Sequence, residues 1–163
     1  MGSSRAMRYF ILPVVLLLAS PITAQTISGT ASVIDGDTIE IHGERVRLHG
    51  IDAVEGRQSC KLPDGKTWLC GADAALALSD RIGRKSVSCE QQDIDRYGRI
   101  VAICTQGGED LGAWMVAEGW AMAYRQYSTA YVEDEARAKA AGRGLWVSEF
   151  LSPWDWRKAA RGN

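Results

Sequence analysis

The residues of this chain whose types and spacing could do chemistry are three acids and two arginines: Asp37, Asp52, Glu55, Arg47 and Arg99. Carboxylate oxygens are the ligands that hard cations such as Ca²⁺ prefer, and a carboxylate can also position a water molecule for attack. Arginine side chains can bind the oxygens of a phosphodiester and stabilise the charge that develops in its transition state. Together these residues indicate metal-assisted hydrolysis of a phosphodiester.

The first acidic group, Asp35-Gly36-Asp37, is weak evidence when it is taken alone. Asp-Gly is among the commonest turn dipeptides, so a solvated turn is the simpler interpretation of this triplet. Its context favours a metal site, because strand-like residues flank the triplet and a second acidic pair, Asp52 and Glu55, follows the next strand pair.

Alternating apolar residues predict a meander of three short strands over residues 27–34, 38–42 and 45–49. If residues 43 and 44 form the second turn, Asp37 and Asp52 become diagonal neighbours on one face of the sheet. The same register places Arg47 opposite Glu40 on the other face. A regular hairpin cannot gather the whole set, so we expect a bulge or strong curvature here.

The rest of the pattern predicts two further strands, at residues 86–91 and 99–105, and three helices, at residues 72–84, 111–118 and 129–141. Residues 56–71 are expected to form a long loop, and the tail after Trp146 gives no clear element. Five strands, with one helix after the third and two after the fifth, fit an α+β fold with a five-stranded OB-type barrel and three helices.

Four cysteines permit two disulfides with three alternative pairings. A turn centred on residues 96 and 97 would place Cys89 directly opposite Cys104, so we pair these two across the hairpin. Cys60 and Cys70 would then close a short loop. A zinc site is the alternative, but the chain contains no C-x-x-C spacing.

The beginning of the chain has the pattern of a secretory signal at residues 1–24. Arg5 and Arg8 precede an apolar run over residues 9–19, and small residues follow up to Ala24, where we expect cleavage. An uncleaved N-terminal anchor, the only membrane contact that we expect, is the alternative. We expect residues 25–163 to form one domain that is secreted or periplasmic.

The charge of the chain offers little general attraction for nucleic acid. Without the candidate signal, which contains two arginines and no acid, 17 basic and 20 acidic residues remain, with a formal net charge of −3. Non-specific nucleic-acid binding usually depends on a basic surface. Any phosphate binding must therefore rely on local arginines and a bound cation.

The segments at residues 33–38, 47–55 and 95–99 resemble the staphylococcal nuclease (thermonuclease) family through their residues and mutual spacing. The resemblance extends from about residue 32 to residue 146. It implies an OB-type barrel with three helices, and Ca²⁺-dependent cleavage of DNA and RNA.

The resemblance also implies roles for individual residues of the metal site. The carboxylates of Asp37 and Asp52 and the main-chain carbonyl of Ala53 would bind Ca²⁺. Glu55 would act as the general base that positions the attacking water. Asp35 would support the site without binding the metal.

The substrate side of the site follows from the same resemblance. Arg47 and Arg99 would bind the scissile phosphate and stabilise its transition state. Tyr97 would lie near the 3′ side of the nucleotide, and Tyr124 would stack on a base.

Two departures from the family pattern lie beside the candidate base. Val54 stands where the family usually has Pro, which removes a constraint on the backbone before Glu55. The following loop carries Cys60 and Cys70, which the staphylococcal archetype lacks. Our hypothesis is that this disulfide restores the order that the missing proline would have provided.

Three functional hypotheses remain at this level. The first is a monomeric, Ca²⁺-dependent nuclease with DNA and RNA as substrates and no stable protein partner. The second is a non-catalytic OB-fold module that binds nucleic acid or a protein partner, and the third is a Ca²⁺-binding module. The chain contains all of the acids and arginines that the nuclease hypothesis requires, which favours catalysis. A Ca²⁺-binding module would account for the acids but would not explain the two arginines.

Overall fold

Five strands of the chain close into a small barrel: β1 (Thr26–Asp35), β2 (Thr38–Ile41), β3 (Glu44–Leu48), β7 (Ser86–Ile94) and β8 (Ile100–Gln106). The computed structural model describes residues 25–162, so the predicted signal at residues 1–24 lies outside the described residues. The sheet has the order β3-β2-β1-β7-β8, and a parallel pairing of β3 with β8 closes it. A short strand, β9 (Glu109–Asp110), extends the edge at β8. The predicted five-stranded OB-type barrel is confirmed.

The core of the barrel follows from the alternation of its strands. Ile39 and Ile41 of β2 and Val46 and Leu48 of β3 are almost completely buried, because every second side chain of a strand points to the same face. Helix α1 (Cys70–Ile82) packs against β1, and its Leu78 and Ile82 join this core.

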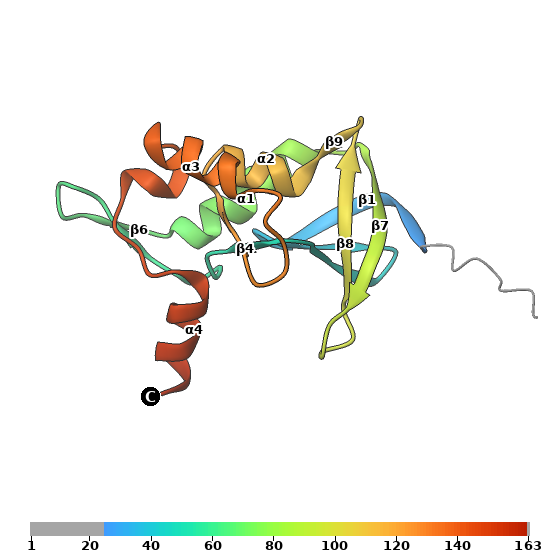
Figure 1. Cartoon of the computed structure of the whole chain (residues 1–163), viewed down its shortest axis with the longest axis horizontal. Helices are drawn as coiled ribbons and strands as arrows, with labels where there is room; N and C mark the ends of the chain where they lie inside the picture. The colour runs from blue at the N-terminus through green and yellow to red at the C-terminus, as the bar shows by residue number, and fades with distance from the viewer. Residues whose placement is uncertain (1–24, 163) are drawn as a thin grey trace, which may run out of the picture.

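Three helices correspond to the predicted ones. Helix α1 is followed by α2 (Leu111–Ala117) and α3 (Val132–Ala140). The carboxylate of Asp110 caps α2 by accepting hydrogen bonds from two backbone N–H groups of its first turn, at 2.8 and 3.2 Å. Figure 1 shows α1, α2 and α3 gathered over one end of the barrel.

A fourth α-helix, α4 (Pro153–Arg161), corrects the expectation of three helices. It follows a short 3₁₀ helix, η1 (Gly144–Val147), in the tail that the sequence left unassigned. The local signals for α4 are present, since Ser152 accepts a hydrogen bond from the Asp155 N–H at 3.3 Å and Pro153 occupies the first turn. In Figure 1, α4 projects from the bottom of the body, on the same side as the turn between β7 and β8.

The loop at residues 56–71 contains more regular structure than expected. It holds a small hairpin, β5 (Cys60–Lys61) and β6 (Thr67–Trp68), and its last two residues begin α1. The backbone of Lys61 exchanges two hydrogen bonds with the backbone of Glu149, at 2.9 and 2.8 Å. The hairpin therefore holds the chain segment that leads into α4.

The register of the hairpin between β2 and β3 differs from the predicted one. The turn lies at His42 and Gly43, which both have positive φ (54° and 84°), and Arg47 pairs with Thr38 and not with Glu40. Two-residue hairpin turns with positive φ at both central residues match the twist of the flanking strands, which explains the shift. The expected irregularity is present as a register shift in β1 between Val33 and Asp35.

Both predicted disulfides are confirmed. Cys89 lies directly opposite Cys104 in the hairpin of β7 and β8, and Cys60 is joined to Cys70. Outside the barrel, β4 (Ile51–Ala53) pairs with β10 (Ala121–Ala123) in a separate two-stranded sheet, in which Asp52 lies opposite Met122. Among residues 25–162, no helix is long and apolar enough to cross a membrane.

Candidate active site

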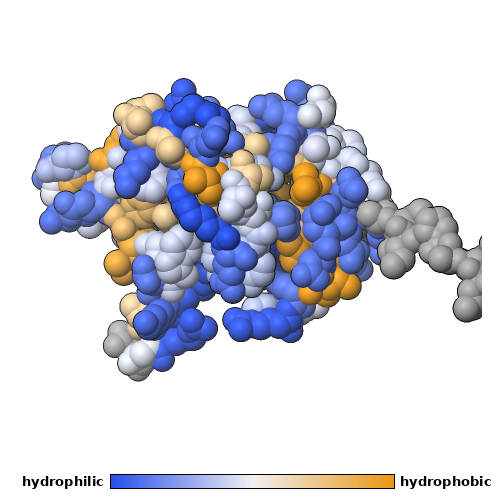
Figure 2. All heavy atoms as spheres, viewed as in Figure 1, coloured by the Kyte–Doolittle hydropathy of each residue, from blue (hydrophilic) through white to orange (hydrophobic). Residues whose placement is uncertain are grey.

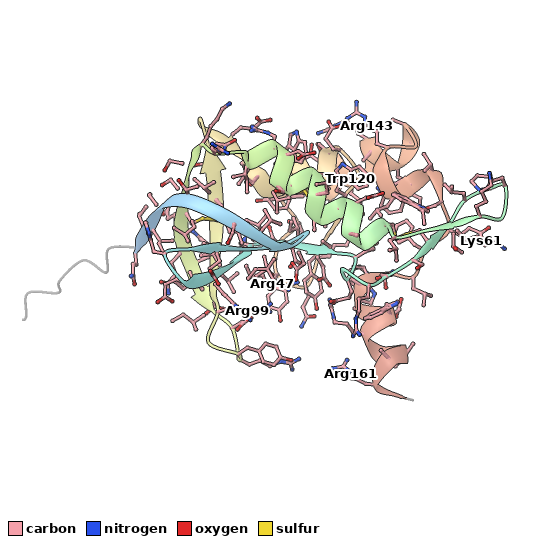
Figure 3. The ribbon with its side chains drawn as sticks, turned by 180° about the vertical axis from the view of Figure 1, so that it is seen from behind. Arg47, Lys61, Arg99, Trp120, Arg143 and Arg161 are labelled. Carbon is pink, nitrogen blue, oxygen red and sulfur yellow. A yellow bond between two sulfur atoms is a disulfide. The ribbon has the colours of Figure 1, made fainter. Side chains whose placement is uncertain are left out.

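A groove of about 1180 Å³ lies between α4 and the turn that joins β7 to β8. Figure 2 shows mainly hydrophilic residues on the two sides of this hollow, and Figure 3 shows Arg47 and Arg99 on the barrel side and Arg161 on α4. The groove also contains most of the predicted site residues. Its arginines provide the local positive charge that the whole chain lacks: Arg45, Arg47, Arg96, Arg99, Arg157 and Arg161.

Asp37 lies in the turn between β1 and β2 and is held by three local contacts. Its Oδ1 accepts a hydrogen bond from the Thr38 hydroxyl at 2.9 Å, and its Oδ2 accepts one from the Ala53 N–H at 3.0 Å. Asp35 accepts a hydrogen bond from the Asp37 N–H at 3.1 Å, so it supports the turn. Gly36 is needed because a Cβ there would come within 2.7 Å of the Ala53 side chain.

Arg47 joins the two candidate metal ligands. Its Nη2 lies 2.9 Å from Asp37 Oδ2 and 2.6 Å from Asp52 Oδ1. Both carboxylates are almost completely buried, and this burial raises the pKa of each, although Arg47 opposes the shift. The structure thus brings together two adjacent acids whose negative charges call for a positive partner.

Glu55 stands on a loop whose backbone is fixed from both sides. Gln58 accepts a hydrogen bond from the Glu55 N–H at 3.3 Å, and its own N–H donates to the Glu55 carbonyl at 2.7 Å. On the other side Gly71 is needed, because a Cβ there would overlap the Glu55 carbonyl oxygen at 1.8 Å. Val54, which precedes Glu55, is buried in a small cluster with Cys60 and Cys70. Packing therefore constrains this loop.

Sequence reasoning missed Arg157, which α4 brings to the same acids. Its Nη1 donates to Glu55 Oε1 at 2.7 Å and to Asp52 Oδ1 at 3.1 Å, and its Nη2 donates to Asp52 Oδ2 at 2.5 Å. Arg157 belongs to the tail after Trp146, for which the sequence predicted no clear element. The Ser152-Pro153 start signal could have predicted the helix, but no local signal could have predicted where it docks.

Arg99 is not brought to the buried acids. It lies at the turn between β7 and β8, where its Nε donates to Asp95 Oδ2 at 2.7 Å. Asp95 also accepts hydrogen bonds from the N–H groups of Tyr97 and Arg99. Although partial burial opposes the shift, these hydrogen bonds lower the pKa of Asp95. The exposed ring of Tyr97 lies 5.6 Å from the Arg99 guanidinium and completes this unit.

Tyr124 lines the groove, but α4 covers one face of its ring. Trp154 stacks on it with ring centres 5.7 Å apart and planes 9° apart, and Tyr127 meets its edge at 4.9 Å. The Tyr124 N–H donates to the Gly50 carbonyl at 2.9 Å, which fixes its position beside β4. The three rings form an aromatic surface in the groove.

The donor set fits a hard divalent cation in its chemistry. The described residues contain no group of three or more His, Cys, Asp or Glu side chains arranged around one point, so protein carboxylates alone do not form a complete metal site. Asp37 and Asp52 nevertheless share one positive partner atom, and each offers carboxylate oxygens of the kind that Ca²⁺ binds together with carbonyl groups and water.

Comparison with known proteins gives relatives that carry nuclease names. An uncharacterized endonuclease of Haemophilus influenzae is 32% identical over 101 residues, which are 60% of this chain and 57% of that protein. A probable staphylococcal-like nuclease of Oryza sativa is 35% identical over 115 residues, 69% of this chain and 28% of that protein. The micrococcal nuclease of Shigella flexneri is 32% identical over 105 residues, 56% of this chain and 60% of that protein.

In each of these relatives the match spans less than two thirds of the relative's own length. The family described as staphylococcal nuclease homologue matches residues 45–148, a stretch that contains Arg47, Asp52, Glu55 and Arg99 and starts after Asp37. The sequence match and the closed barrel agree, and the chain belongs to the staphylococcal nuclease homologue family.

Proposed function

We propose that this protein is a Ca²⁺-dependent nuclease that hydrolyses phosphodiester bonds of DNA and RNA. The observation that carries the proposal is the convergence of Asp37, Asp52 and Arg47 beside Glu55, in a groove that Arg99 also lines. Membership of the family and the nuclease names of the relatives support it. Residues 25–163 would act as one domain, and the two disulfides fit a secreted or periplasmic location.

The metal side of the reaction would depend on the buried acids. Asp37, Asp52 and the carbonyl of Ala53 would hold the cation, and waters would complete its shell. When bound, Ca²⁺ supplies positive charge beside the phosphate. The raised pKa values of Asp37 and Asp52 support this role, because a divalent cation would relieve the cost of two buried negative charges.

The chemical step would be the attack of a water molecule on phosphorus. Glu55 would accept a proton as the water oxygen bonds to phosphorus, and the bond from phosphorus to the leaving oxygen would break. The leaving oxygen would then take up a proton, which balances the reaction. Glu55 suits this role because its side chain is about one-third exposed to the groove while its backbone is fixed.

The arginines would act on the phosphate oxygens. Arg47 has five N–H donors, and contacts with the two acids use only part of this capacity. Arg99 would approach from the opposite side on the turn between β7 and β8. Tyr97 beside it and Tyr124 across the groove would contact sugar or base, as stacking side chains do in proteins that bind single strands.

The test is hydrolysis of single-stranded DNA and of RNA by the oxidised protein, in Ca²⁺ and then in EGTA. We expect cleavage only with Ca²⁺, and a loss of about 10²–10⁴-fold for Glu55→Gln if Glu55 is the base. Glu133→Gln is the matched control, because Glu133 is fully accessible on α3 and should leave the rate unchanged.

Two outcomes would contradict the proposal. Cleavage that persists in EGTA would exclude the Ca²⁺ requirement, and an unchanged rate for Glu55→Gln would exclude Glu55 as the base. Binding of DNA without any cleavage would favour the alternative of a non-catalytic OB-fold module.

A further inference from the structure

We infer that Arg157 is a built-in competitor of the divalent cation: α4 places its guanidinium on Asp52 and Glu55, and cation binding displaces it. The inference rests on the proposed function for the identity of the cation site. It adds a regulatory contact from a part of the chain that lies beyond the family match at residues 45–148.

The contact uses the oxygen atoms that a cation would need. Both oxygens of Asp52 accept hydrogen bonds from Arg157, at 3.1 and 2.5 Å, and Oδ1 accepts a further one from Arg47 at 2.6 Å. The Asp52 side chain has no exposed surface, so bulk solvent does not reach these oxygens. Because Arg157 also binds Glu55 at 2.7 Å, it occupies a candidate metal ligand and the candidate base together.

The local charge favours exchange of Arg157 for a divalent cation. Asp37, Asp52 and Glu55 with Arg47 have a formal charge of −2, which is the charge that a divalent cation neutralises. With Arg157 in place the charge is −1. A divalent cation and the Arg157 guanidinium are both positive, and they would compete for the same oxygens of Asp52 and Glu55. We therefore expect binding of one to exclude the other.

The attachment of α4 would allow such an exchange. The segment before the helix is fixed, since Gln58 Nε2 donates to the Leu151 carbonyl at 2.7 Å and Lys61 pairs with Glu149. The helix itself contacts the groove through Arg157 and through Trp154 on Tyr124, and its last four residues are exposed. Figure 1 shows α4 leaving the body as a projecting element. A helix anchored at one end can release its side chains without unfolding the barrel.

The consequence would be a threshold for the cation. A ligand that must displace an internal partner binds with an apparent affinity reduced by the fraction of molecules in which the site is free. At low Ca²⁺ concentration Arg157 would keep Asp52 and Glu55 paired, and Trp154 would cover Tyr124. The site would become complete only when Ca²⁺ is abundant.

The test is calorimetric titration of Ca²⁺ into the full protein and two variants. We expect Arg157→Gln to bind Ca²⁺ about 10-fold or more tightly than the unmodified protein, because the cation no longer has to displace Arg157 from Asp52 and Glu55. Arg161→Gln is the matched control. This variant removes the same charge from the same helix, and Arg161 has no hydrogen bond or ion pair within residues 25–162. The Ca²⁺ affinity of the variant should therefore differ from that of the unmodified protein by no more than about twofold.

Thermal unfolding gives a second readout that does not depend on activity. In EGTA, Arg157→Gln should lower the midpoint of thermal unfolding, because Asp52 loses a buried partner. Saturating Ca²⁺ should then raise the midpoint of the variant by more than it raises that of the unmodified protein. If Arg157→Gln does not fold, Arg157→Lys serves in both measurements. Lysine keeps the charge but cannot form the two-pronged contact, so tighter Ca²⁺ binding is still expected.

The outcomes separate this inference from the proposed function. Equal or weaker Ca²⁺ binding by the Arg157 variants, with Ca²⁺-dependent cleavage intact, would overturn the inference alone. If neither the protein nor its Arg157 variants binds Ca²⁺, the proposed cation site and the inference both fall.

Discussion

The two arginines to which the same role is assigned, Arg47 and Arg99, are held in opposite ways. Arg47 lies on β3 between the carboxylates of Asp37 and Asp52, both of which are almost completely buried. Arg99 lies at a turn, bound to Asp95 four residues earlier in the chain. The first arginine is mostly buried and bound to interior acids, and the second is part of a local unit at the turn between β7 and β8.

The difference separates two demands that the proposed phosphodiesterase reaction would place on the site. The acidic side must keep negative charges close together away from water, so it needs strong positive partners and a rigid frame. The arginine at the turn must meet a substrate of variable shape, and a short loop with a local partner suits that task. Changes to the acidic side should therefore alter stability and activity together, while changes at the turn should alter activity alone.

The largest combined effect is expected for Arg47→Gln. The change leaves Asp37 and Asp52 without a shared partner, which should cost about 3–5 kcal/mol of unfolding free energy, the usual cost of breaking a buried pair. The rate should fall by about 10²–10³-fold if Arg47 stabilises the transition state. Urea unfolding and single-stranded DNA cleavage measure the two effects. Arg84→Gln, which changes an exposed arginine outside the groove, should change neither, and a stable Arg47 variant would contradict this account.

Arg99→Gln should give a similar loss of rate with a much smaller loss of stability. We expect a rate lower by about 10²–10³-fold and a change in unfolding free energy below about 1 kcal/mol, because ion pairs that water still reaches contribute little. Arg84→Gln, outside the groove, is again the control for the loss of one positive charge. An Arg99 variant with near-normal kcat would exclude Arg99 from the transition state.

The two disulfides should show the same contrast at a smaller scale. Cys60–Cys70 closes the loop after Glu55, while Cys89–Cys104 joins two barrel strands. Replacing the first pair by serine should reduce the rate by about 10-fold, while the second replacement should cause the larger loss of thermal stability, in line with the usual 2–4 kcal/mol for a disulfide. Cleavage rates and unfolding midpoints of the two double variants decide the question. Parallel losses of rate and stability for Cys60 and Cys70 would contradict the idea that this bond orders the candidate base.

The smallest effect expected is the pH dependence of Asp95. Its pKa is lowered in the folded protein, so its contribution to stability is present above the unfolded value of 3.8 and is lost as the pH falls through the folded value. The pKa values of Asp37 and Asp52 are raised, so their ionisation has the opposite sign and costs stability as the pH rises above 3.8.

Urea unfolding of Asp95→Asn between pH 3 and 7 isolates the first of these contributions. We expect the variant to be less stable than the unmodified protein at pH 7 by no more than about 1 kcal/mol, with the difference vanishing at the acid end. A difference that does not change with pH would show that the Asp95 charge is not responsible.

Much of the fold follows from local patterns. The five barrel strands, the first three helices and both disulfides could be predicted, because strand alternation, helix periodicity and the turn at residues 96 and 97 act over short distances. The register of the hairpin between β2 and β3 could not be predicted, since it depends on the positive φ that His42 adopts. The predicted turn was one residue away, and that changed the partner of Arg47 from Glu40 to Thr38.

The sequence by itself determined the chemical inventory of the candidate site. The acids supply oxygen ligands for a cation, and the arginines supply hydrogen-bond donors for phosphate oxygens. Gly36, between Asp35 and Asp37, is the small residue of this set. The pairing of Arg99 with Asp95 is equally local, because the two residues are only four positions apart in one turn.

Only the tertiary structure decided which charges meet inside the groove. Arg157 is 105 residues from Asp52 and 102 from Glu55, and it reaches them because Gln58 and Lys61 fix the segment before α4. No periodicity or spacing encodes such a contact, since it results from the docking of one finished element on another. Burial of the acids has the same origin, and that burial raises the pKa of Asp37 and Asp52.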